Sequence, residues 1–235
     1  GLFVLLFACI APHALGMSAA AAFLGALASA LLVFFVSAYA GASRLTIVLA
    51  GMALTAIFTA GMNTVLIFNP DAYVNSSGFL VGSLSGVMMS ELAIPGAMIC
   101  AGLLLAAGQG TRLNILSLGD EGAHALGLNV NRTRLALLSL AALLAGAAVC
   151  FSGLIGFVGL IVPHVVRYVV GHDNRRVLAL SPIVGAILVC ACDTIARTLF
   201  APFEIPVGIC MALVGGPFFI YLILHSRKGS VDGRA

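Results

Sequence analysis

The sequence predicts an all-α protein, a polytopic bundle of transmembrane helices that forms a single domain over residues 1–235. Hydrophobic residues make up 62% of the chain and charged residues 8%, with a mean hydropathy of +1.18. That leaves too little polar surface to cover a soluble globule. Several uncharged runs reach the roughly 20 residues that a helix needs to cross a bilayer. Ala, Gly and Leu recur throughout, as in closely packed helices, and the strict alternation of a membrane barrel is absent.

Two uncharged runs of spanning length follow a broken helix at the start of the chain. The apolar run at 1–11 stops at Pro12, which interrupts a helix, and it predicts only the end of a truncated span. The runs at 18–40 and 45–68 each exceed roughly 20 residues without a charge and predict complete spans. A tight connection over residues 41–44 joins them.

Turn-forming residues divide the next part of the chain. The segment NPDAYVNSSG at 69–78 contains Asn, Pro, Asp and Gly and predicts an extramembrane loop. The apolar stretch at 79–108 is longer than one crossing requires and is interrupted by glycines, Glu91 and Pro95. It predicts a short surface helix followed by a span over about residues 92–108.

The C-terminal half is expected to contribute four more spans. A glycine-rich bend divides the overlong stretch 135–170 into one span to about residue 151 and a short one to about residue 169. The remaining elements are a loop at 171–176, a span at 177–200, a turn at 201–204, a span at 205–224 and a basic tail at 225–235. Together with the partial helix at the start, the sequence predicts about eight spans.

A polar segment at 109–134, QGTRLNILSLGDEGAHALGLNVNRTR, separates the apolar runs of the two halves. Ser117 and Asp120 stand three positions apart, as in a capping box, and predict the start of a short helix over 118–126. Gly127 follows at the position of a left-handed C-terminal cap. The segment therefore predicts a small helix between two membrane spans.

This small helix is expected to have two different faces. Its small and apolar face consists of Leu118, Gly122, Ala125 and Leu126. Its polar residues lie elsewhere on the surface and are Asp120, Glu121 and His124. Such a helix suits docking against another protein, but an ordinary solvated loop helix fits the spacing equally well.

The basic residues predict the orientation of the chain, because short cytoplasmic loops collect Lys and Arg. With alternating crossings, ten of the eleven basic residues fall on one side and only Arg197 falls on the other. The polar segment, the 171–176 loop and the C-terminus are therefore expected to face the cytoplasm. The ten residues are Arg44, Arg112, Arg132, Arg134, Arg167, Arg175, Arg176, Arg227, Lys228 and Arg234.

Several motifs, in the same order along the chain, resemble the permease subunits of ABC importers for ferric siderophores, haem and cobalamin. The matching motifs are LNILSLGDEGAHALGL at 113–128, SGLIGFVGLIVPHVVRYVVGHDNRR at 152–176, DTIARTLFAPFEIPVGI at 193–209 and GGPFFIYLI at 215–223. Weaker matches at 43–54 and 80–86 extend the similarity toward the N-terminus. The resemblance implies a subunit of ten spans, of which this chain carries the third onward.

The resemblance also implies an assembly in the bacterial inner membrane. It consists of two copies of the permease, a cytoplasmic ABC ATPase dimer and a periplasmic substrate-binding protein, with no nucleic acid. The permease does no chemistry and binds no cofactor of its own, while ATP and Mg²⁺ bind the ATPase. In agreement, the chain contains no GxxxxGK[ST] phosphate loop. Its six cysteines lie in apolar stretches without ligand spacing, which predicts buried apolar residues that form neither disulfides nor a metal site.

Three groups of site residues follow from the resemblance. In the family, a segment similar to 113–128 is a coupling helix that docks in a cleft of the ATPase. The coupling residues implied here are Leu116, Leu118, Gly119, Asp120, Glu121, Gly122, Ala125, Leu126 and Gly127. The residues implied to dock the binding protein are Arg197 and Glu204. The pathway and gate residues are Ala42, Ser43, Thr55, Thr59, Met62 and Asn63.

Alternatives remain open at the level of the sequence. Arg197 could simply pair with Asp193 one helical turn away. The chain could also be a secondary transporter driven by an ion gradient, which would require mid-membrane acids and an inverted repeat, or a membrane scaffold that transports nothing. Only Asp193 lies well inside an apolar run, and no clear repeat is visible. The expected function is therefore import of an iron chelate by alternating access, with a ferric siderophore favoured over haem and cobalamin.

Overall fold

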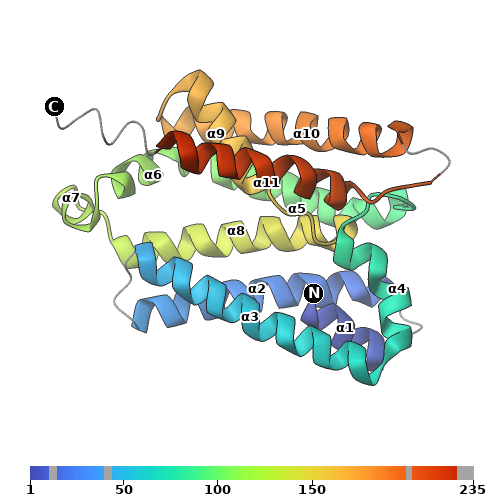
Figure 1. The fold of residues 1–235 in the computed structure, drawn as a ribbon. Helices are drawn as coiled ribbons and strands as arrows, with labels where there is room; N and C mark the ends of the chain where they lie inside the picture. Colours follow the sequence, from blue (N-terminus) through green and yellow to red (C-terminus); the bar gives the residue numbers. More distant parts are fainter. Residues whose placement is uncertain (11–14, 40–43, 200–202, 227–235) are drawn as a thin grey trace.

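The computed structural model describes residues 1–10, 15–39, 44–199 and 203–226, and all regular structure in these ranges is α-helical (Figure 1). This confirms the predicted all-α class. The helices are α1 (Leu2–Ile10), α2 (Leu15–Tyr39), α3 (Arg44–Phe68), α4 (Pro70–Val81), α5 (Met89–Ala107), α6 (Gly110–Ser117), α7 (Asp120–Ala125), α8 (Val130–Ser152), α9 (Val158–Val170), α10 (Asn174–Leu199) and α11 (Val207–Ser226).

Helix α8 lies in the middle of the bundle. It packs against α2 on one side and α5 on another, while α1, α2 and α3 contact one another and α9, α10 and α11 form a second group (Figure 1). A core of buried residues fills the space between the last three helices: Ile161, Cys192, Ala196, Val207, Cys210 and Met211. Three of the six cysteines, expected to be buried, are exposed instead: Cys9, Cys100 and Cys190.

Many large apolar side chains lie on the outside of the bundle. Ile57, Ile67 and Phe68 of α3 are each more than 60% exposed, and most of the other described side chains of α3 are exposed or only half-buried. A soluble protein rarely exposes so much contiguous apolar surface, whereas lipid or a neighbouring subunit covers it in a membrane. The outward apolar residues therefore agree with the membrane-spanning fold expected from composition.

Eight helices correspond to the predicted spans, although they differ in length. Within the described residues, three helices are long and apolar enough to cross a membrane alone: 48–68, 130–152 and 174–199. A fourth crossing is possible if α5 and α6, bent by 54° relative to each other, count as one span. Helix α9 has 13 residues, about 20 Å, so it is short, as expected after the glycine-rich bend. It is nevertheless too short to cross a membrane by itself, whereas a short span was predicted there.

The predicted loop at 69–78 is wrong, because these residues belong to helix α4. Pro70 occupies the first turn of α4, where its missing N–H and its fixed φ angle favour a helix start. The expected surface helix after residue 79 is also absent, since α4 ends at Val81. Residues 82–88 form an irregular connection to α5 instead.

The capping box predicted at Ser117 is also wrong. Helix α6 continues from α5 and ends at Ser117, whose hydroxyl donates to the Asn114 carbonyl at 2.6 Å. Helix α7 begins only at Asp120, after Gly119, and has six residues. The predicted cap at Gly127 is confirmed, because its φ angle is 78° and the Leu128 N–H donates to the Ala123 carbonyl at 3.0 Å.

The two ends of the bundle are used as reference points below. The α7 end contains α6, α7, the start of α8 and the connection between α9 and α10, and α7 extends beyond the other helices (Figure 1). The α4 end contains α4, the connection from α4 to α5, and the start of α11. At the α4 end, backbone hydrogen bonds join segments that are distant in sequence. The Gly208 N–H donates to the Gly82 carbonyl at 3.0 Å, and the Leu154 N–H donates to the Phe79 carbonyl at 2.9 Å.

Candidate functional site

Helices α6 and α7 form a protrusion at the α7 end, which we define as residues 110–129. Leu118 and Leu126 flank α7 and are 65% and 61% exposed, whereas Ala123 of α7 is fully buried. Glu121 and Ala125 are also exposed. Two large leucines beside a short helix thus form an exposed apolar surface at the α7 end.

Asp120, in the first turn of α7, forms an ion pair with Arg134 of α8. Both guanidinium NH₂ groups donate to the carboxylate, at 2.6 and 3.1 Å, so the contact is bidentate. The Arg134 side chain is only 21% exposed, compared with 52% for Asp120. The pair therefore connects α7 to the side of α8, and Asp120 uses both of its oxygens within the subunit.

A second set of polar contacts connects α6 to the start of α10. The Asn114 amide donates to the Asp173 carboxylate at 2.8 Å and accepts from the Asn174 backbone N–H at 2.9 Å. The Arg175 guanidinium donates to the Thr111 hydroxyl at 3.0 Å through Nε and at 2.6 Å through Nη2. We call this set the α6–α10 clasp. It holds the first part of the protrusion against a different helix from the one that holds α7.

The neighbours of Asp173 in the clasp stabilise its ionised carboxylate. The hydrogen bond from Asn114 lowers the pKa of the Asp173 carboxyl below its ordinary value, and the backbone N–H of Arg175 and the positive charges of Arg176 and Arg175 act in the same direction. Arg176 lies 3.9 Å from the carboxylate. Asp173 is therefore ionised at neutral pH and remains a hydrogen-bond acceptor for α6.

The structure brings most of the predicted coupling residues together on the protrusion. Leu116 is half-buried in α6, Gly119 provides the break before α7 with φ 94°, and a Cβ on Gly122 would lie 3.2 Å from the Leu118 Cβ. The predicted apolar face is only partly present, since Ala123 rather than Gly122 is the fully buried residue of α7. Helix α7 begins at Asp120 and not at the predicted Leu118, and this later start changes which residues face the bundle.

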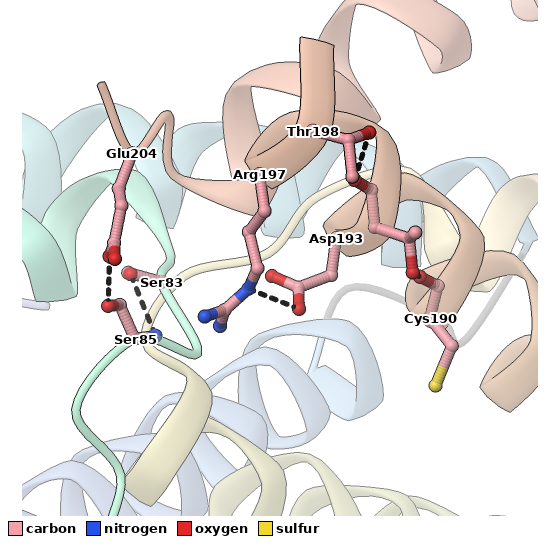
Figure 2. A network of polar contacts seen from close by, with 8 residues as sticks. Ser83, Ser85, Cys190, Asp193, Arg197, Thr198 and Glu204 are labelled. Atoms are coloured by element: carbon pink, nitrogen blue, oxygen red, sulfur yellow. Dashed lines mark hydrogen bonds and ion pairs between the residues drawn. The ribbon is translucent and has the colours of Figure 1, made fainter. Parts of the chain in front are cut away.

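The two predicted docking residues lie at the α4 end (Figure 2). Arg197 Nε donates to Asp193 Oδ2 at 2.8 Å, one turn earlier on α10, so the simple pairing considered from the sequence is present. Glu204 accepts a hydrogen bond from the Ser85 hydroxyl. These residues, with Ser83, line a small open pocket of about 60 Å³, and the Arg197 side chain extends between Asp193 and the Ser85–Glu204 pair.

The predicted pathway residues on α3 do not all share one environment. Thr55, Thr59 and Asn63 are exposed at spacings of four residues, which places them along one stripe of the helix. Met62 is half-buried, and its sulfur lies 2.5 Å from the position that a Cβ on Gly1 would occupy, so it packs toward the N-terminal helix. The gate residues Ala42 and Ser43 lie outside the described residues.

Sequence reasoning did not identify Arg134, Asn114 or Asp173 as site residues. Arg134 is 14 positions from Asp120, and Asn114 is 59 positions from Asp173. Neither separation corresponds to a helical period, so no local pattern indicates these pairs. The only available signal was that all three residues fall in the short polar segments expected on the same side of the membrane.

Comparisons with known proteins agree with this architecture. A family model for the FecCD transport family matches residues 1–225. The chain is 41% identical over 208 residues to the hemin transport system permease protein HmuU of Yersinia pestis, an alignment that covers 88% of this chain and 62% of that protein. It is 40% identical over 207 residues to the cobalamin import system permease protein BtuC of Halobacterium salinarum, covering 86% and 55%.

Two further comparisons extend over more of the chain. The Fe(3+)-citrate import system permease protein YfmD of Bacillus subtilis is 35% identical over 228 residues, covering 97% of this chain and 67% of that protein. The fold is similar to a solved metal-chelate type ABC transporter in an inward-facing conformation, with a TM-score of 0.74, 28% identity, and coverage of 91% of this chain and 75% of that chain. The chain spans about three-fifths of the length of the first curated relatives that it matches.

Proposed function

Because this chain belongs to the FecCD transport family, we propose that it acts as the permease subunit of an ABC importer and moves an iron chelate from the periplasm to the cytoplasm by alternating access. Relatives at 35–41% identity are named as permeases for hemin, cobalamin and Fe(3+)-citrate, which supports a metal chelate as the class of cargo. In this proposal the chain is a multi-pass inner-membrane protein with its C-terminus in the cytoplasm.

The observation that carries the proposal is the α6–α7 protrusion. It extends beyond the other helices, exposes Leu118 and Leu126, and is attached to the bundle by hydrogen bonds and an ion pair (Figure 1). A transporter without its own ATP site needs such a surface to receive motion from an ATPase. The protrusion is therefore proposed to dock on a cytoplasmic ABC ATPase dimer, which holds the ATP and Mg²⁺, while the permease binds no cofactor.

The remaining partners follow from the other surfaces. A second copy of the chain is proposed to cover the exposed side of α3, so that Thr55, Thr59 and Asn63 line a pathway between the copies. Arg197 and Glu204 are proposed to meet a periplasmic substrate-binding protein. A pathway with uncharged polar side chains suits a large chelate whose charge is already neutralised, and we favour a ferric siderophore, with haem and cobalamin as the alternatives.

Reconstitution tests the proposal directly. The chain should co-purify with its ATPase, and vesicles that contain the complex and the binding protein should accumulate ⁵⁵Fe-siderophore only when ATP is hydrolysed. Parallel assays with haem and cobalamin identify the cargo. Uptake driven by an ion gradient without an ATPase would contradict the proposal in favour of a secondary transporter, and ATPase binding without uptake of any chelate would favour a scaffold.

The docking surface has its own test. Replacing both exposed leucines, Leu118→Ser with Leu126→Ser, should abolish co-purification of the ATPase, because the apolar contact area is lost while the bundle does not depend on these side chains. Replacing Gly122 by Trp should uncouple transport, since a Cβ there would already lie 3.2 Å from the Leu118 Cβ and the larger ring would have to displace Leu118. The thermal stability of the permease in detergent should stay unchanged in the leucine variant. A stable variant that still binds the ATPase and transports normally would refute docking at this surface.

A further inference from the structure

Helix α7 depends on outside contacts for its position. It has six residues, fewer than an isolated helix needs to be stable in water. Gly119 and Gly127, at its two ends, adopt φ angles of 94° and 78°, where L side chains are strained and glycine is free to turn. A hydrogen bond from the Leu128 N–H to the Ala123 carbonyl closes the C-terminal end of α7. Side-chain contacts to α8 add to what fixes α7 relative to the membrane helices.

The Asp120–Arg134 ion pair is the polar contact best placed to do this. The fork of Arg134 meets both carboxylate oxygens, a geometry that fixes orientation as well as distance. Arg134 is largely sheltered, and it belongs to the second turn of α8, the helix in the middle of the bundle. Asp120 also lies in the first turn of α7, where a negative charge stabilises the helix.

The rest of the protrusion is attached elsewhere. The α6–α10 clasp holds α6 through Asn114 and Thr111, whose partners Asp173 and Arg175 belong to the start of α10 and the residue before it. The protrusion is thus attached to two different membrane helices through two separate polar joints. A displacement of α7 reaches α8 through the ion pair and the packing of α7 on α8.

We propose that Asp120 and Arg134 are positioning residues for coupling, and that their ion pair makes α7 and the start of α8 move as one body when the ATPase displaces α7. The proposal rests on the function proposed above. It assigns Asp120 to contact within the subunit, so that contact with the ATPase is left to Leu118, Glu121 and Leu126. Arg134 thereby joins the coupling machinery without touching the partner.

A charge swap tests this assignment. In the reconstituted complex, Asp120→Arg and Arg134→Asp should each retain ATPase co-purification but lower ATP-dependent uptake by at least about tenfold, because α7 then moves independently of α8. The double variant D120R/R134D should restore at least half of the wild-type uptake. Arg134→Lys should give an intermediate rate, since an ammonium group cannot form the bidentate contact.

The control is Arg132→Asp, which makes the same charge change on an exposed side chain two residues earlier on α8. It should leave uptake within about twofold of wild type. Distance measurements between spin labels on α7 and α8 provide a second readout. The distribution should broaden in each single variant and narrow again in the swap.

Two results would overturn the proposal. Uptake in the double variant no better than in the worse single variant would show that Asp120 meets the ATPase directly. Full uptake in both single variants would show that the ion pair transmits nothing. Failure of the underlying function looks different, because the wild-type chain itself would then bind no ATPase or take up no chelate.

Discussion

The two ends of the bundle use their charged residues in opposite ways. At the α7 end, ionic and polar contacts join different helices: α7 to α8 through Asp120 and Arg134, and α6 to α10 through the clasp. At the α4 end, the ion pair of Arg197 lies within one helix, with Asp193. Distant segments are joined there by backbone hydrogen bonds such as Gly208 to Gly82, together with the hydrogen bond from Ser85 to Glu204. An ion pair thus joins two helices at the α7 end, whereas the ion pair at the α4 end stays within one helix.

The difference suggests different mechanical roles. A contact between two helices transmits motion from one helix to the other. A contact within one helix involves no second helix, so its residues can exchange partners without moving another helix. The α7 end has a contact of the first kind, between Asp120 and Arg134. At the α4 end, loss of the Arg197–Asp193 pair would leave the backbone hydrogen bonds in place.

The largest expected effect comes from breaking the backbone contact at the α4 end. A Cβ on Gly208 would lie 1.9 Å from the Val81 carbonyl oxygen, and no side-chain rotation relieves a clash with backbone. Overpacking costs about 1–3 kcal/mol even where side chains adjust, so Gly208→Ala should lower the thermal unfolding midpoint in detergent by about 4–10 °C. The control is Gly216→Ala on the same helix, where no atom lies within 4 Å. Equal midpoints for the two variants would show that the contact is not rigid.

The next effect concerns the clasp. Asn114→Leu removes both hydrogen bonds that join α6 to residues 173 and 174, so amide exchange in α6 should accelerate by about tenfold or more, and coupled uptake should fall several-fold. Arg112→Ala is the matched control, because the Arg112 side chain donates to Gln109, next to the same helix, and not to α10 within the described residues. If the control matched Asn114→Leu in exchange rate, the clasp would not be what holds α6.

A smaller effect is expected at Arg197. Arg197→Glu should weaken binding-protein affinity by roughly tenfold at low salt and by much less at 0.5 M salt, because an exposed charge acts mainly through screened attraction. Asp193→Asn should do the opposite and raise the affinity slightly, since it frees Arg197 from its intrahelical partner. Titration of binding protein onto the reconstituted permease measures the affinity and distinguishes the two variants. No change in either variant would leave Arg197 as a residue of local packing.

The smallest effect is the response of the clasp to pH. The folded pKa of Asp173 lies below the ordinary value of 3.8, so its contribution to stability is fully present above that value and is lost as the pH falls through the lower, folded value. Amide exchange in α6, corrected for its intrinsic pH dependence, should therefore stay constant from pH 7 to about pH 4 and increase below. In Asp173→Asn this increase should disappear. An increase already at pH 5 to 6 would contradict the sign of the pKa shift.

The fold was largely predictable because uncharged runs of membrane-spanning length are a strong signal. The spans at 45–68, 135–151 and 177–200 were all located, with boundaries that shifted by a few residues, and the short α9 followed from the glycines before it. The prediction failed at residues 69–78, because Asn69 and Pro70 favour a turn and a helix start equally. Sequence alone does not decide between the two without the packing partners of α4.

The candidate site was less predictable than the fold. The polar segment pointed to the protrusion and to Leu118 and Leu126, because a two-faced helix is visible in the order of residues. The polar segment did not reveal that Asp120 forms an ion pair with Arg134. A salt bridge between residues 14 positions apart depends on the tertiary arrangement of α7 and α8. For the same reason, the sequence did not reveal that the Met62 sulfur lies close to Gly1.

Phe157, the residue immediately before helix α9, is a bulky residue with a φ angle of 66°, and a Cβ on Gly215 of α11 would lie 2.3 Å from its ring. The two positions therefore constrain each other during evolution. A lineage that acquires a larger residue at position 215 must first reduce the side chain at 157, and glycine at 157 would also relieve the left-handed backbone. Aligned relatives should accordingly vary at these two positions together, with a large residue at one accompanied by a small residue at the other.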